Sequence, residues 1–273
     1  MIAKLSIWSQ FFNGLSPEDA VLEFIKGGIF CSELSDEHGR ELMERDTDYI
    51  KTGKAFGAFL KENNFEMKQG HLWLSIKICS DETAVDKLCK WIDMYEAIGI
   101  KNMVLHCDTM KDSGLDIKEI FDLNVKKLKL VADHIKDKDV TVCLENLLKE
   151  GLVRNADDLL NLIDHIGSDR FGICLDTGHL NLTDKNQTEF IHKANKKLKA
   201  LHIADNQGET DQHWMPFAHG TVDFKAVIKA LRDVDYNGYF NLEIPGESVI
   251  YPMEIRRAKL EYVKKCYDYL MSE

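Results

Sequence analysis

The chain has 273 residues, of which 44% are hydrophobic, and 46 acidic against 35 basic side chains give it a formal net charge of −11. This apolar content excludes a disordered chain, and only 17 glycines and 4 prolines exclude a collagen-like or low-complexity one. The negative charge disfavours nucleic acid as a partner, because phosphate backbones are repelled on average.

Seven cysteines, none of them in a CxxC pair, argue against a disulfide framework. We therefore expect a protein of the reducing cytoplasm. The first residues lack a small-residue cleavage site, so they predict a first strand and not a signal peptide. Apolar runs stay well short of the roughly 20 residues that span a bilayer, so no membrane association is expected.

Eight short apolar segments alternate with longer segments of helical period, which is the pattern of repeated βα units. The expected strands lie at 5–9, 29–34, 67–74, 102–107, 140–145, 172–176, 200–203 and 239–244. Helix-start signals stand at Ser16, Asn155 and Asp223, and Gly99 and Gly167 stand where helices should stop. A last helix is expected over 253–271.

Eight such units in this length predict an α/β fold, a (β/α)8 TIM barrel, as a single domain over 1–273. A doubly wound open sheet is the alternative. That fold usually carries a glycine-rich phosphate-binding turn after its first strand, and Gln10-Phe11-Phe12-Asn13-Gly14 has no such pattern. The barrel is therefore the preferred prediction.

Five of the later strands are expected to end with a leucine followed by a side chain that can bind a metal. Side chains alternate between the two faces of a strand, so each leucine can face the helices while the next residue faces the barrel interior. The carboxyl ends of barrel strands converge at one mouth, where barrel enzymes keep their active sites. The five pairs are Leu105-His106, Leu144-Glu145, Leu175-Asp176, Leu201-His202 and Leu242-Glu243.

Four of these residues form the predicted metal site: Glu145, Asp176, His202 and Glu243. Ionised carboxylates that face one another repel and lose hydration, and a divalent cation removes that penalty. Three oxygen ligands and one nitrogen favour Mn2+, Mg2+ or Co2+, with Zn2+ as an alternative.

Several ordered segments also carry a resemblance to a known family. They are Leu175-Asp176-Thr177-Gly178-His179, Leu201-His202-Ile203-Ala204-Asp205-Asn206, Asp211-Gln212-His213 and Gly220-Thr221-Val222-Asp223-Phe224. These segments resemble the xylose isomerase-like TIM-barrel superfamily, and most closely its sugar (phosphate) isomerase/epimerase members. The resemblance implies the same four metal ligands, with Glu145 and Glu243 as the acid/base pair beside a sugar, sugar phosphate or related polyol ketone. An inosose-type dehydratase would use nearly the same site and stays open.

The same superfamily contains metal-dependent endonucleases that cleave DNA at abasic sites. Similarity to these places nine metal-ligand positions on His71, His106, Glu145, Asp176, His179, His202, Asp211, His213 and Glu243. Against this alternative, the loops at 34–38 and 107–112 lack the arginines and aromatic wedges that grip a bent duplex. The sugar enzyme is therefore preferred. His71, His106, His179, Asp211 and His213 are expected to bind either additional metal ions or substrate.

Four further side chains are candidates for substrate contact. Trp8 and Trp214 offer aromatic faces on which a sugar can stack, although a tryptophan in a barrel is more often part of the core. His219 is expected near the mouth, and its alternative is an ordinary exposed loop position. Glu33 ends the second strand, where it could either bond a sugar hydroxyl or be solvated. The sequence reveals neither the substrate nor the oligomeric state, so a homo-oligomer stays open.

Overall fold

Eight parallel strands form the inner wall of the protein, whose computed structural model describes residues 3–110 and 113–272. Their hydrogen-bonded order is β7-β6-β5-β4-β3-β2-β1-β8, and a parallel bridge between Ile203 and Leu242 brings the two ends of the sheet together. The strands are β1 Lys4–Trp8, β2 Cys31–Leu34, β3 Glu66–His71, β4 Asn102–Leu105, β5 Thr141–Glu145, β6 Phe171–Asp176, β7 Leu198–His202 and β8 Tyr239–Leu242.

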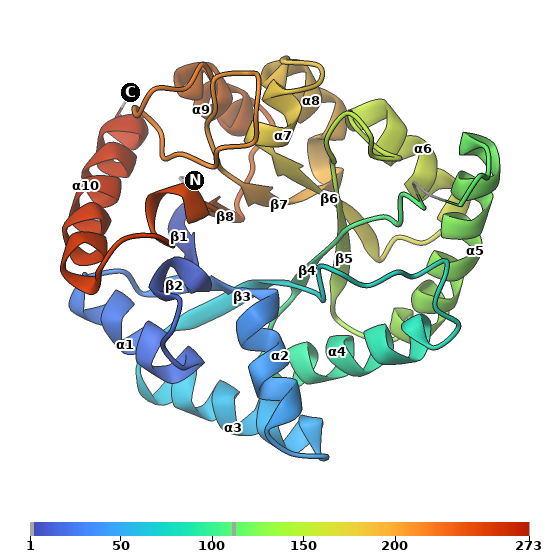
Figure 1. Ribbon diagram of the computed structural model, residues 1–273, viewed down its shortest axis with the longest axis horizontal. Helices are drawn as coiled ribbons and strands as arrows, with labels where there is room; N and C mark the ends of the chain where they lie inside the picture. The colour runs from blue at the N-terminus through green and yellow to red at the C-terminus, as the bar shows by residue number, and fades with distance from the viewer. Residues whose placement is uncertain (1–2, 111–112, 273) are drawn as a thin grey trace.

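The helices lie outside this ring of strands (Figure 1). This arrangement confirms the predicted (β/α)8 TIM barrel. The α-helices are α1 Pro17–Lys26, α2 Asp36–Glu44, α3 Tyr49–Glu62, α4 Ala84–Ile98, α5 Ile117–Ile135, α6 Ala156–Ile166, α7 Thr177–Asn181, α8 Gln187–Ala194, α9 Phe224–Asp233 and α10 Met253–Ser272. Short 3-10 turns occupy Ser9–Phe12, Asn195–Lys197 and Pro245–Glu247.

The predicted helix signals act as expected. The side chains of Ser16, Asn155 and Asp223 each accept a hydrogen bond from the backbone N–H three residues later, which caps α1, α6 and α9. Gly99 and Gly167 end α4 and α6 with φ of +108° and +73°, a left-handed conformation that costs glycine little.

The alternation of side chains along the strands divides the interior into two apolar regions. Leu105, Leu144, Leu175, Leu201 and Leu242 belong to the large core between the strands and the helices. A separate small cluster lies inside the barrel and consists of Val104, Cys143, Cys174 and Ala200. Because the metal-ligand candidates lie two positions after these inner residues, they share the inner face and lie nearer the carboxyl end.

Several element boundaries differ from the sequence prediction, and two of the differences concern the segments 34–38 and 67–74. The segment 34–38, expected as a loop, contains the start of α2, because the Ser35 hydroxyl accepts a hydrogen bond from the N–H of His38 at 3.2 Å. The expected strand 67–74 ends at His71. Residues 111 and 112 of the predicted loop 107–112 lie outside the described residues. Within the described part of the chain, no helix is long and apolar enough to cross a membrane.

Candidate metal centre

The four predicted ligands meet at the carboxyl end of the barrel. Glu145, Asp176 and His202 are the last residues of β5, β6 and β7, and Glu243 directly follows β8. Each offers a ligand atom, and these atoms all lie within 4.8 Å of one another. The imidazole Nδ1 of His202 lies 3.2 Å from Oε1 of Glu145 and 3.3 Å from Oε2 of Glu243. The arrangement surrounds a position that a single cation could occupy.

Three buried atoms of this quartet lack a hydrogen-bond partner among the described residues. They are Oε1 of Glu145, Oδ2 of Asp176 and Nδ1 of His202. The three residues are at most 1% exposed. Leaving such atoms unpaired costs about 1–3 kcal/mol each, and more for charged groups. A divalent cation among them would satisfy all three, so the donor set fits a metal ion with mainly oxygen ligands.

Backbone contacts hold Asp176 in this orientation. Its Oδ1 accepts a hydrogen bond from the N–H of His179 at 2.6 Å as the N-cap of α7, which leaves Oδ2 toward the cluster. The side chain of Asn146 bonds both the N–H and the carbonyl of Asp176, at 2.8 Å and 3.0 Å. The carbonyl of Asn146 lies 3.0 Å from Nδ1 of His179. Asn146 was not predicted from the sequence, although its position directly after Glu145 places it at the same strand end.

A second group of possible ligands adjoins the first on one side. Nε2 of His106 lies 2.9 Å from Oε2 of Glu145, and Nε2 of His71 lies 3.6 Å from the same oxygen. These three residues form a further set that could hold a metal ion. The thiol of Cys174, with Glu145 and His202, makes another such set deeper in the barrel.

A third group adjoins the quartet on the other side and consists of Asp176, His179 and His213. Oδ2 of Asp211 lies 3.4 Å from Nε2 of His179 and 3.1 Å from Nε2 of His213. His213 has a φ of +47°, and its Nδ1 lies 2.9 Å from the Glu243 carbonyl. The structure therefore brings all nine residues suggested by the endonuclease resemblance to one place.

The carboxylates of the cluster favour positive charge among them, either on protonated imidazoles or on a bound cation. Burial opposes ionisation of Glu145, but the nearby His202 and His106 outweigh it and hold the pKa of Glu145 well below its usual range. Burial likewise opposes protonation of His71, yet the nearby carboxylate of Glu145 raises the pKa of His71 to about 9. Asp211 overcomes the burial of His213 and raises its pKa to about 10. Protons and a metal cation would therefore compete for these groups.

Two groups have their pKa shifted toward the neutral form, because the effect of burial outweighs that of the neighbouring charges. Burial raises the pKa of the Glu243 carboxyl above its usual range, against the charges of His202 and His213. Burial also lowers the pKa of His106, although Glu145 lies beside it. Glu145 and Glu243 therefore differ in acidity although they face the same imidazole.

A cavity of about 420 Å3 opens above the cluster. Trp8, a predicted substrate contact, lines it together with Asp36, Glu37, Leu74 and Val249, which were not predicted from the sequence. Most members of the nine-residue cluster also line it, namely His71, His106, Glu145, His179, Asp211, His213 and Glu243.

Three of the predicted substrate contacts do not line this cavity. The described residues that line it do not include Trp214, His219 or Glu33. The ring of Trp214 contacts that of His219 edge to face with centroids 6.1 Å apart, and His219 is exposed. Glu33 is completely buried inside the barrel, where its carboxylate contacts His202 and Gln69. The expectation that Glu33 is a solvated or sugar-binding strand end is wrong.

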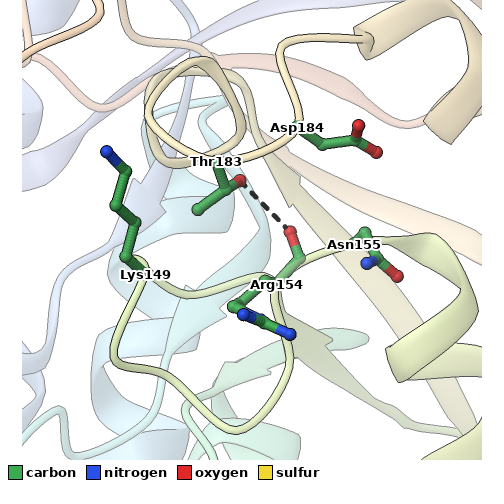
Figure 2. A pocket seen from close by; sticks show the side chains of 5 residues that line it. All are labelled: Lys149, Arg154, Asn155, Thr183 and Asp184. Atoms are coloured by element: carbon green, nitrogen blue, oxygen red, sulfur yellow. Dashed lines mark hydrogen bonds between the residues drawn. The ribbon is translucent and has the colours of Figure 1, made fainter.

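A separate polar cavity of about 330 Å3 lies between two rim loops (Figure 2). Lys149 and Arg154 extend from the loop after β5, and Asp184 comes from the loop after α7. The Thr183 hydroxyl lies 3.5 Å from the Arg154 carbonyl, which brings the two loops into contact. None of the nine cluster residues lines this cavity, so it does not extend the metal centre.

Fold and site together define a TIM barrel with a carboxylate and imidazole cluster at the carboxyl ends of its strands. The chain belongs to the xylose isomerase-like TIM barrel family, whose model matches residues 33–266. This result confirms the family resemblance inferred from the sequence.

The relatives of the chain include both classes of enzyme that the sequence suggested. An L-ribulose 3-epimerase from Methylomonas sp. is 24% identical over 197 residues, which cover 67% of each chain. A probable endonuclease 4 from Metamycoplasma arthritidis is 28% identical over 169 residues, which cover 57% of this chain and 60% of that protein. The chain thus spans less than two thirds of the length of that endonuclease.

The fold is shared with solved sugar epimerases. The structure of D-psicose 3-epimerase with D-tagatose from Clostridium cellulolyticum H10 has a TM-score of 0.82 and 15% sequence identity. The similarity covers 98% of this chain and 99% of that one. At this identity the similarity establishes the fold only.

Proposed function

We propose that the protein is a divalent-metal-dependent epimerase or isomerase of a sugar, a sugar phosphate or a related polyol ketone. The observation that carries the proposal is the pair Glu145 and Glu243, which approach one nitrogen of His202 from different strands at 3.2 Å and 3.3 Å. Two carboxylates beside one cation site can remove and return a proton at the carbon next to a carbonyl.

The quartet Glu145, Asp176, His202 and Glu243 would hold the cation, for which Mn2+, Mg2+ or Co2+ are favoured and Zn2+ is the alternative. The cation would act as a Lewis acid on a neighbouring carbonyl and make the adjacent C–H bond more acidic. The unpaired buried atoms of three of these residues support this assignment.

The carboxylates of Glu145 and Glu243 would move the protons. One removes a proton from the carbon beside the carbonyl, and the other returns a proton to the opposite face of that carbon, which inverts its configuration. Return of the proton to the neighbouring carbon instead exchanges aldose and ketose. Groups in these roles contribute about 100- to 10,000-fold to a rate. Loss of a neighbouring hydroxyl as water would give the dehydratase alternative.

The cavity is consistent with a small polar substrate. Its volume of about 420 Å3 lies within the range of about 300–1,000 Å3 that small-molecule sites occupy. Trp8 would supply an aromatic wall, and His106, His179 and His213 would supply groups that bond hydroxyls.

The test is a panel of ketoses, their phosphates and inosose, incubated with Mn2+ in deuterated water. Incorporation of deuterium at the carbon beside the carbonyl, with an epimer or isomer as product, is expected for at least one compound. Release of water from inosose would assign the dehydratase. Turnover of the whole panel at the rate of the uncatalysed reaction would contradict the proposal.

A phosphodiesterase is the second candidate, because all nine ligands suggested by that resemblance converge. The net charge of −11 remains an argument against a duplex as substrate.

Metal content and cleavage separate the two candidates. After equilibration with Mn2+ or Zn2+ and removal of free metal, one ion per chain is expected for the sugar enzyme and three for the phosphodiesterase. Incubation with an oligonucleotide duplex that contains one abasic site should leave the duplex intact. Cleavage at that site together with three bound ions would replace the primary proposal.

A further inference from the structure

Glu33 lies in a fully buried polar layer beneath the metal centre. Its Oε1 is 3.0 Å from Nε2 of His202, and its Oε2 accepts a hydrogen bond from Nε2 of Gln69 at 2.8 Å. The same Oε2 accepts a further bond from the amide of Asn241, whose Oδ1 accepts a hydrogen bond from Ser6 at 2.7 Å. These five residues come from five different strands, and each is at most 1% exposed.

A histidine that binds a metal must be neutral, and this layer determines which nitrogen of the neutral His202 keeps its proton. A carboxylate can only accept, so Nε2 of His202 donates its hydrogen to Glu33. Nδ1 then turns toward Oε1 of Glu145 and Oε2 of Glu243, where it lacks a hydrogen-bond partner among the described residues. A lone pair on Nδ1 is what a cation at this position requires.

We propose that Glu33 is a positioning residue that fixes the orientation and the Nε2–H tautomer of His202, so that Nδ1 faces the cation. The inference rests on the proposed metal centre. It assigns a role to a residue that has no access to substrate. Partners of this kind, which bond the outer nitrogen of a ligating histidine, typically change metal affinity about 10- to 100-fold when they are removed.

The substitution Glu33→Gln tests this role because it keeps the shape of the side chain and changes only its hydrogen bonding. In the wild type, the side-chain amides of Gln69 and Asn241 both donate hydrogen bonds to Oε2 of Glu33. The new carbonyl oxygen should therefore stay there, which places the new NH2 group at the position of Oε1. That NH2 group would donate to Nε2 of His202 and move the imidazole proton to Nδ1, where it opposes a cation.

Ser6→Ala is the matched control. It removes a buried hydrogen bond from the same layer, to Asn241, without touching His202 or Glu33. If the layer served only to stabilise the barrel, both substitutions would have the same effect on the site. Thermal unfolding of the metal-free proteins shows whether each variant is folded.

Two measurements decide the inference. In metal-free protein labelled with 15N-histidine, the Nε2 proton of His202 should give a downfield, slowly exchanging NMR signal in the wild type and in Ser6→Ala. The signal is assigned by its loss in His202→Asn, and it should disappear in Glu33→Gln. The affinity for Mn2+ alone, measured from free Mn2+ by electron paramagnetic resonance, should fall about 10- to 100-fold in Glu33→Gln and stay within about threefold in Ser6→Ala.

Retention of the Nε2 signal in Glu33→Gln, or its absence from the wild type, would overturn the inference. Equal loss of Mn2+ affinity in Ser6→Ala would also overturn it, because it would indicate a structural role only. A wild type that binds no Mn2+ would refute the proposed metal centre, whereas the proton signal would still decide the role of Glu33. The two failures are therefore distinguishable.

Discussion

Oε1 of Glu145 and Oε2 of Glu243 lie 3.2 Å and 3.3 Å from one atom, Nδ1 of His202, although Glu145 ends β5 and Glu243 follows β8. Closure of the barrel creates this relationship. The N–H of Ile203 donates to the Asn241 carbonyl at 2.7 Å, and the N–H of Glu243 donates to the Ile203 carbonyl at 3.2 Å. These bonds bring the end of β8 beside β7, so that both carboxylates reach the same imidazole.

Replacement of Glu243 by glutamine should abolish exchange of the substrate proton with deuterated water. The amide keeps the size of the side chain but cannot accept the proton, so a loss of about 100- to 10,000-fold is expected. The measurement is deuterium incorporation at saturating Mn2+, and Glu189→Gln on the exposed face of α8 is the matched control. Undiminished exchange would remove Glu243 from the proposed reaction.

Removal of metal should destabilise the protein as well as stop turnover. A cation present at 100 times its dissociation constant stabilises the folded state by about 2.7 kcal/mol. Calorimetry with Mn2+ and with a chelator should therefore show a Tm that is several degrees higher with metal. The same Tm under both conditions, with full activity in the chelator, would contradict a catalytic cation.

Replacement of Trp8 by alanine should raise KM, because Trp8 lines the central cavity. Loss of one aromatic stacking contact corresponds to about 0.5–1.5 kcal/mol, or roughly a 2- to 12-fold increase in KM. Trp214→Ala is the control, since the ring of Trp214 faces His219 outside that cavity. Steady-state kinetics of both variants test this, and an equal rise in KM would show that the substrate also reaches Trp214.

The contact between α1 and α10 should make stability depend on pH. Arg257 donates to both carboxylate oxygens of Glu23, at 2.8 Å and 3.0 Å, and these bonds, together with one from Lys26, lower the pKa of Glu23 to about 2 against the opposing effect of burial. A carboxyl whose pKa is depressed by folding stabilises the protein fully above its unfolded pKa, about 4.5, and loses this contribution as the pH falls from there to about 2.

Glu23→Gln should therefore lower the free energy of unfolding by about 1 kcal/mol at pH 7, the order expected for a charge-assisted pair with a half-exposed arginine. The difference from the wild type should shrink between pH 4.5 and pH 2. Urea unfolding at several pH values measures it. Asp139→Asn, in an exposed pair with Lys101, should have no measurable effect at any pH. A difference for Glu23→Gln that is constant with pH would exclude the ion pair as its cause.

The pattern of strand ends follows from the amino-acid sequence alone. Each leucine of the five pairs faces the helices, and each following residue faces the barrel interior, because alternation along a strand is a local property of the backbone. The capping residues and the helix-ending glycines are predictable for the same reason. The family resemblance adds the nine-residue set, which the structure brings together.

The position of Glu33 could not be predicted from the alternation of side chains along one strand. This residue precedes Leu34, whereas the ligands follow their leucines, and it pairs in register with Gln69, two residues before His71. It therefore lies one layer below the mouth, among Gln69 and Asn241. Trp214 and His219 similarly depend on the path of a long loop, in which their rings contact each other and do not line the cavity.

The sequence by itself determined the kind of barrel and which face of each strand carries the acids and imidazoles, since these follow from periodicity along a single segment. Only the tertiary structure decided the depth at which each side chain stands and which imidazole nitrogen turns toward the acids. Depth depends on the register between strands that are far apart in the chain, and the nitrogen depends on a hydrogen bond from the opposite side of the barrel.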